Sequence, residues 1–149
     1  MSSPAVKPTV GWKEMVALPE LGLRRIVAKL DSGARSAALH AEDILPYQTS
    51  MGWRVAFTVH PHRSLEGRGI RCTAPLIDRR EVTNSGGEIQ ERYVISTEIL
   101  LGDYSWIAEI TLTDRTRMRY PMLLGRSTLG DRYLIDPGLS YTLGKGRRR

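Results

Sequence analysis

The residues best placed to do chemistry are Asp31-Ser32-Gly33-Ala34, which follow the apolar run Ile26-Val27-Ala28-Lys29-Leu30. A strand over 24–30 would leave the Asp31 carboxylate at the end of a rigid element, and Gly33 permits a tight turn with unusual backbone dihedrals. A carboxylate presented in this way is suited to general acid or base catalysis. Because Asp, Ser and Gly are also the commonest turn residues, an ordinary hairpin turn is the alternative.

A second stretch of similar design occurs later in the chain. An apolar strand predicted over 118–124 ends abruptly in Gly125 and Arg126. Between the two stretches, 81–95 is predicted to be a hairpin, because Asn84-Ser85-Gly86-Gly87 supplies residues that tolerate positive φ. Each feature alone recurs by chance, whereas the ordered set is more specific.

This ordered set resembles the retropepsin-like aspartic peptidases, in which an Asp-Thr/Ser-Gly-Ala turn supplies the catalytic acid. The closer resemblance is to a bacterial branch, the RimB-like proteins, which often carry the label of ATP-dependent zinc proteases. It covers nearly the whole chain, from Val10 to Pro137. The segments that carry it are Leu18–Leu21, Ala28–Arg35, Asn84–Arg92 and Leu112–Pro121.

The resemblance implies a catalytic mechanism and an oligomeric state. Aspartic peptidases need two carboxylates about 3 Å apart that share one proton. This chain has one such turn, so the resemblance implies a homodimer in which Asp31 of one subunit faces Asp31 of the other. Ser32 would brace the two turns and Gly33 would leave room for the carboxylates. Water is then the nucleophile, and no cofactor is expected.

Further roles follow from the same resemblance. Ala34 and Arg35 would contact the substrate. The tip of the 81–95 hairpin would form a flap over the cleft, although a Gly-Gly hairpin is more often only a turn. The flap residues would be Ser85, Gly86 and Gly87.

We call the turn Asp31-Ser32-Gly33-Ala34 the acid turn. The strand that supports this turn in the family corresponds to Leu124, Gly125 and Arg126. The family Arg supports the fold through a buried ion pair. Viral members have an acidic partner for it four positions after the catalytic Asp, but this chain has Arg35 there. We therefore expect the partner of Arg126 elsewhere, with Glu42 and Asp43 as candidates.

Basic residues beside the acid favour an acidic substrate. Lys29 and Arg35 would pair with carboxylates at the mouth of the cleft. RimB-like proteins are associated with a ligase that adds glutamates to a small-subunit ribosomal protein. The resemblance therefore implies acidic or poly-glutamylated ribosomal-protein tails as substrate and that ligase as a partner. The alternative is a non-enzymatic basic adaptor that binds the ligase or the ribosome.

The zinc and ATP labels find no support in the residues. His40, His60 and His62 are the three histidines, and no His-Glu-x-x-His motif is present. The sequence has no Walker-type Gly-rich loop and no nucleophile elbow. We predict no metal site, and an aspartic peptidase that is not a zinc protease.

Composition predicts one soluble cytoplasmic domain. The 149 residues can bury a core without disulfides, and Cys72 has no partner for one. No signal peptide and no apolar stretch near the ~20 residues needed to cross a bilayer is present, so no membrane is expected. The net charge of +6 suggests an acidic partner. Nucleic acid is not expected as the main ligand, because the few aromatics are not interleaved with the Arg residues.

The pattern of elements predicts an all-β fold, a small closed β-barrel of the retropepsin (acid protease) type. Strands are expected over 10–18, 24–30, 36–40, 52–59, 70–77, 95–101, 104–112 and 133–135, with at most a short helix near the C-terminus at 127–130. Pro46 should break the chain after 40, and Pro75 should mark an edge or a bulge. The predicted divisions are a flexible leader at 1–9, the barrel domain at 10–140 and a basic disordered tail at 141–149.

Overall fold

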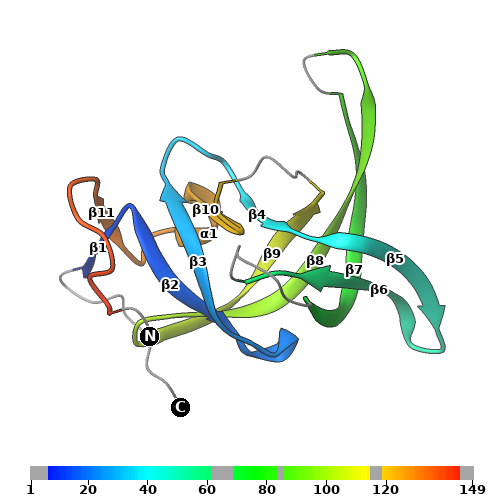
Figure 1. The fold of residues 1–149 in the computed structure, drawn as a ribbon, viewed down its shortest axis with the longest axis horizontal. Coiled ribbons are helices and arrows are strands. Elements are labelled where there is room, and N and C mark those ends of the chain that lie inside the picture. The colour runs from blue at the N-terminus through cyan, green and yellow to red at the C-terminus, as the bar shows by residue number, and fades with distance from the viewer. Residues whose placement is uncertain (1–6, 62–68, 84–85, 115–118, 145–149) are drawn as a thin grey trace.

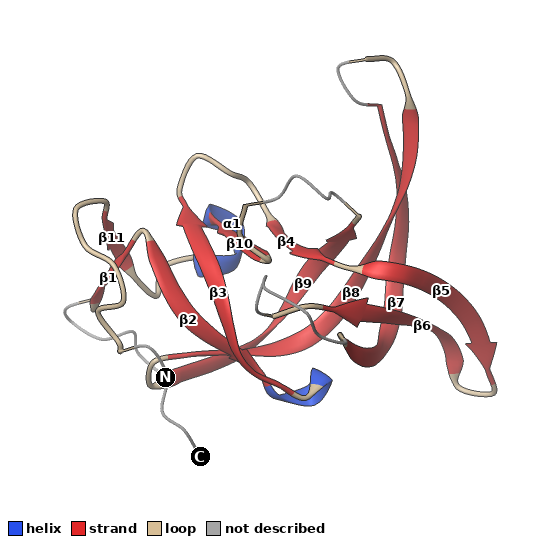
Figure 2. Ribbon diagram, viewed as in Figure 1, coloured by secondary structure: helices blue, strands red, loops and turns tan. Residues whose placement is uncertain are grey.

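The computed structural model describes residues 7–61, 69–83, 86–114 and 119–144. Strands make up 65% of the structure, which confirms the all-β class. They are β1 (Thr9–Gly11), β2 (Lys13–Leu18), β3 (Leu23–Asp31), β4 (Ala37–His40), β5 (Glu42–Thr49), β6 (Gly52–Val59), β7 (Ile70–Thr83), β8 (Ile89–Leu101), β9 (Tyr104–Thr113), β10 (Met122–Gly125) and β11 (Leu134–Asp136). The described residues also form a 3-10 turn, η1 (Pro19–Leu21), and one short helix, α1 (Arg126–Leu129) (Figure 2). Within these ranges no helix is long and apolar enough to cross a membrane.

Six strands close into the predicted barrel. The order β2-β3-β10-β4-β9-β8 returns to its start because β2 also pairs with β8, at Ala17 and Leu100 (Figure 1). The strands alternate between buried and more exposed side chains, as expected for a sheet with one face on a core. In β3 the buried residues are Leu23, Ile26, Ala28 and Leu30. The next residue, Asp31, therefore turns away from the core.

Strand β10 lies between the two strands that flank the Asp31 turn. It runs parallel to β3, with Gly125 opposite Asp31, and antiparallel to β4, with Met122 opposite Leu39. Because β3 and β4 are consecutive in the chain but not adjacent in the sheet, the turn that joins them must pass over the end of β10. This crossing brings the two stretches singled out in the sequence together.

The sheet continues beyond the barrel through β7, β6 and β5. Pro46 does not break the chain as predicted, because β5 is the last strand in this order and an edge strand does not need every N–H. The strand predicted over 70–77 continues to Thr83, and its register against β8 shifts between Leu76 and Asp78. The irregularity therefore lies just after Pro75, which itself pairs with Arg54 of β6.

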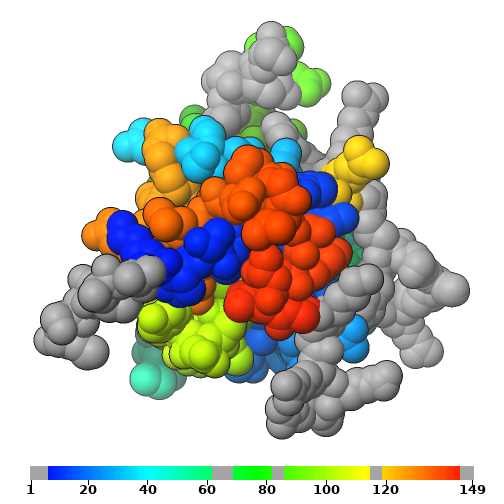
Figure 3. Space-filling view, turned by 90° about the vertical axis from the view of Figure 1, so that its left-hand side faces the viewer, coloured from blue at the N-terminus to red at the C-terminus, as the bar shows by residue number. Residues whose placement is uncertain are grey.

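The N-terminal and C-terminal segments pack together on one side of the barrel (Figure 3). Strands β1 and β11 pair in parallel, with Val10 opposite Ile135. The fully buried Glu14 carboxylate joins both segments: it accepts hydrogen bonds from the Gly11 N–H at 2.7 Å, the Thr142 N–H at 3.0 Å, the Thr142 hydroxyl at 2.6 Å and the Leu143 N–H at 3.2 Å. The packed part of the chain thus includes residues on both sides of the predicted 10–140 bounds.

Candidate active site

The Asp31 carboxylate lies at the end of β3 in a defined orientation. Its Oδ1 accepts a hydrogen bond from the Gly33 N–H at 2.9 Å, and the Ala34 N–H closes the turn on the Asp31 carbonyl at 3.0 Å. Its Oδ2 is 4.0 Å from the Lys29 ammonium, and the Asp31 side chain is 37% exposed. One carboxylate oxygen is therefore held by a main-chain N–H, while the side chain remains exposed enough to contact another molecule.

The first residues of α1, directly after β10, hold the Asp31 turn in place through their main-chain N–H groups. The Arg126 N–H donates to the Ala34 carbonyl at 2.9 Å and the Ser127 N–H donates to the Arg35 carbonyl at 3.0 Å. This contact needs a glycine at 125, because a β-carbon there would lie 2.5 Å from the Ser36 carbonyl oxygen. The sequence prediction that Gly125 and Arg126 lie beside the acid turn matches this geometry.

The contacts of Arg126 differ from the buried ion pair that the resemblance implied. Its side chain is exposed, and Nη1 donates to the carbonyls of Gly33 at 3.3 Å and Ser32 at 3.5 Å. Among the described residues, no carboxylate pairs with Arg126, so the expectation of Glu42 or Asp43 as its partner is wrong. Arg126 instead stabilises the acid turn through main-chain oxygens.

The predicted flap residues lie at the tip of the hairpin formed by β7 and β8. Gly86 and Gly87 are exposed, and Gly87 has φ +85°, as expected for a tight turn. Ser85 lies outside the described residues. The hairpin projects well beyond the barrel (Figure 1). Its role as a flap remains a prediction.

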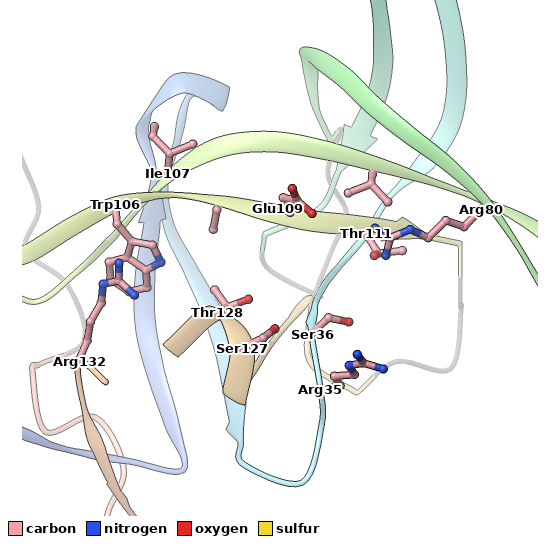
Figure 4. Close-up of a pocket in the computed structure, with 12 residues that line it drawn as sticks. Arg35, Ser36, Arg80, Trp106, Ile107, Glu109, Thr111, Ser127, Thr128 and Arg132 are labelled. Carbon is pink, nitrogen blue, oxygen red and sulfur yellow. The ribbon is translucent and has the colours of Figure 1, made fainter. Parts of the chain in front are cut away.

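A groove of about 750 Å³ begins at the C-terminal end of the acid turn (Figure 4). Of the predicted site residues, Arg35 lines it; Asp31 and Ala34 do not. The lining residues are Arg35, Ser36, Arg80, Val94, Trp106, Ile107, Ala108, Glu109, Thr111, Ser127, Thr128 and Arg132. Sequence reasoning missed Arg80, Trp106, Glu109 and Arg132, because no motif connects these distant positions.

Comparison with known proteins decides the family. The profile of the RimB-like family, described as retropepsin-like aspartic endopeptidase RimB, matches residues 9–146. The chain belongs to the RimB-like family. A crystal structure of a Legionella pneumophila protein of unknown function is similar in fold, with a TM-score of 0.78 and 29% identity over 93% of this chain and 99% of that one.

Longer relatives contain a segment like this RimB-like chain. Proteins named probable alpha-L-glutamate ligase are 42% identical in Shewanella halifaxensis, over 91% of this chain, and 42% identical in Parasynechococcus marenigrum, over 95% of it. In both cases the match spans 30% of the relative. The ligase name therefore describes proteins about three times as long as the matched segment.

Two histidines of this RimB-like domain share one carboxylate, an arrangement that sequence reasoning did not predict. Glu42 Oε2 is 3.2 Å from His40 Nε2, and Glu42 Oε1 is 3.3 Å from His60 Nε2. The hydrogen bond from His40 and the nearby His60 hold the pKa of Glu42 below its usual value. The described residues contain no group of three or more His, Cys, Asp or Glu side chains suited to a metal ion, and His62 lies outside them.

Proposed function

We propose that this RimB-like chain is a homodimeric aspartic endopeptidase whose site contains Asp31 from each of two subunits. The observation that carries the proposal is the Asp31 turn: its carboxylate is oriented by the Gly33 N–H, supported by the β10 crossing and open on one side. One turn supplies one carboxylate, so a second copy must supply the other. The family description as a retropepsin-like aspartic endopeptidase supports this reaction.

The paired carboxylates would divide acid and base roles. Two carboxyl groups about 3 Å apart cannot both ionise, so they share one proton. The ionised member takes a proton from water, which attacks the peptide carbonyl, and the protonated member gives its proton to the carbonyl oxygen. Proton transfer to the leaving nitrogen then completes hydrolysis. Because the two groups titrate as a unit, activity should have a bell-shaped pH dependence.

The charges near the turn support an acidic peptide as substrate. Lys29 and Arg35 are basic and lie on the two sides of Asp31 in the sequence, and both can pair with carboxylates. The similarity to segments of probable glutamate ligases supports a link to glutamate chains. We propose acidic or poly-glutamylated ribosomal-protein tails as the substrate and a cytoplasmic location.

A second candidate function is a non-enzymatic adaptor that binds a glutamate ligase or the ribosome. The observation that favours it is that the matched segment forms only 30% of proteins named as ligases. A domain joined to a larger protein can serve as a docking module. The net charge of +6 also suits an acidic partner.

A cleavage assay in the presence of a chelator separates these functions and tests the need for metal. The purified protein is incubated with a peptide that carries a poly-glutamate tail, with and without EDTA, and the products are identified by mass spectrometry. We expect cleavage at the same rate in both, because a carboxylate pair activates water without a metal ion. Loss of cleavage in EDTA and its recovery with added zinc would contradict the aspartic mechanism. Binding without any cleavage would favour the adaptor.

A further inference from the structure

The groove beside the acid turn has basic side chains at both ends. Arg35 and Arg80 lie at one end, and Arg132 lies at the other, beside Trp106 (Figure 4). Glu109 is the one acidic residue of the described lining and lies between the two ends. The charge distribution therefore favours a ligand with separated negative charges.

Arg132 is held in place by an aromatic ring. Its guanidinium carbon is 4.5 Å from the centre of the Trp106 ring. Stacking leaves the N–H groups at the edge of the guanidinium plane able to bind a carboxylate. Because the side chain is already ordered, binding costs less conformational entropy than it would for a mobile arginine.

Arg80 is oriented by a neighbouring carboxylate on the same strand. Its Nε is 2.8 Å from Asp78 Oδ2, and this hydrogen bond keeps the pKa of Asp78 below its usual value. An arginine has five N–H donors, and this contact uses the Nε donor. The terminal nitrogens of Arg80 lie at the groove, near Thr111 (Figure 4).

The length of the groove sets the length of its ligand. Trp106 and Thr111 line opposite ends of it and both belong to β9. At about 3.3 Å for each strand residue, they are about 17 Å apart, which is the span of about five residues of extended peptide.

We propose that this groove is an extended subsite for the acidic part of a peptide, with Arg35 and Arg80 binding carboxylates next to the acid turn and Arg132 binding one about five residues further along. This inference rests on the proposed function in taking the Asp31 turn as the place where the peptide enters. It adds a distant specificity residue, Arg132, which Trp106 positions.

The test is the affinity of labelled hexaglutamate for the full-length Asp31→Asn protein, measured by fluorescence anisotropy. In this background Arg132→Gln should weaken binding about two- to fivefold, as expected for one exposed charge pair. Triglutamate, which is too short to reach both ends, should be affected less. Arg132→Lys should be intermediate, because it keeps the charge and loses the planar stacking. Glu109→Gln should strengthen binding, because it removes a repulsive charge.

A matched control separates a local contact from overall charge. Arg24→Gln removes the same charge at the end of β3 that lies away from Asp31. It should change hexaglutamate affinity less than Arg132→Gln. Three results would overturn the proposal. The first is that the two variants weaken binding equally, and the second is that Arg132→Gln has no effect. The third is that single-stranded RNA competes for the site more strongly than unlabelled hexaglutamate. If binding depends on Arg132 but the wild-type protein cleaves nothing, the subsite stands and the peptidase function fails. If the wild-type protein cleaves the peptide and Arg132→Gln does not change the KM, the peptidase function stands and the subsite proposal fails.

Discussion

Asp31→Asn should lower peptide cleavage by about a thousandfold or more while the protein stays folded. The loss is expected because an amide can neither share the proton of the carboxylate pair nor take one from water. The fold should survive because the Asn side-chain oxygen can still accept the Gly33 N–H, and because the position is partly exposed. Steady-state kinetics and urea unfolding measure the two effects, and the change in unfolding free energy should stay within about 0.5 kcal/mol.

Asp103→Asn provides the control for this substitution. Asp103 lies in the exposed turn between β8 and β9, and its replacement makes the same chemical change away from the site. We expect it to leave both activity and stability near their wild-type values. Cleavage retained by a folded Asp31→Asn protein would place the catalytic centre at other residues.

Gly125→Ala should damage both the fold and the site. Its β-carbon would lie 2.5 Å from the Ser36 carbonyl oxygen, 2.7 Å from the Ser36 nitrogen and 2.8 Å from the Ala34 carbonyl oxygen. Because all three are main-chain atoms, the acid turn itself must move. We expect a loss of about 2–3 kcal/mol in unfolding free energy, typical of overpacking. Activity should fall further than stability explains, because the turn carries Asp31.

The comparison for this variant is Gly138→Ala, in an exposed turn. The nearest atom to a β-carbon there is Asp136 Oδ1 at 3.3 Å, so the change should cost less than about 0.5 kcal/mol. If Gly125→Ala were as stable and as active as Gly138→Ala, the close contact between the end of β10 and the acid turn would not be needed for the site.

Local alternation was sufficient to predict many of the strands. The prediction over 52–59 matches β6, and the pair around Gly102 matches the turn from β8 to β9. Proline was less informative, because its effect depends on the place of its strand in the sheet. Pro46 lies on an edge strand and is tolerated there, a fact that only the sheet order reveals.

The candidate site was predictable where its residues are contiguous in the sequence. The Asp31 turn and the Gly125-Arg126 segment were each recognisable, and the sheet brings them together as expected. The main-chain contacts of Arg126 could not be predicted, because any nearby carbonyl oxygen can accept a hydrogen bond from an arginine. The groove could not be predicted either, because it depends on the spatial meeting of β7, β9 and the segment after α1.

The most direct test of the account is the activity of mixtures of wild-type and Asp31→Asn chains at constant total protein. The two chains carry different tags, so that subunit exchange can be verified by co-purification. If each site needs Asp31 from both subunits, mixed dimers are inactive and activity follows the square of the wild-type fraction. An equimolar mixture should then retain about a quarter of the wild-type activity. Activity of about a half, with exchange verified, would mean that one chain holds a complete site, and it would contradict the paired-carboxylate account.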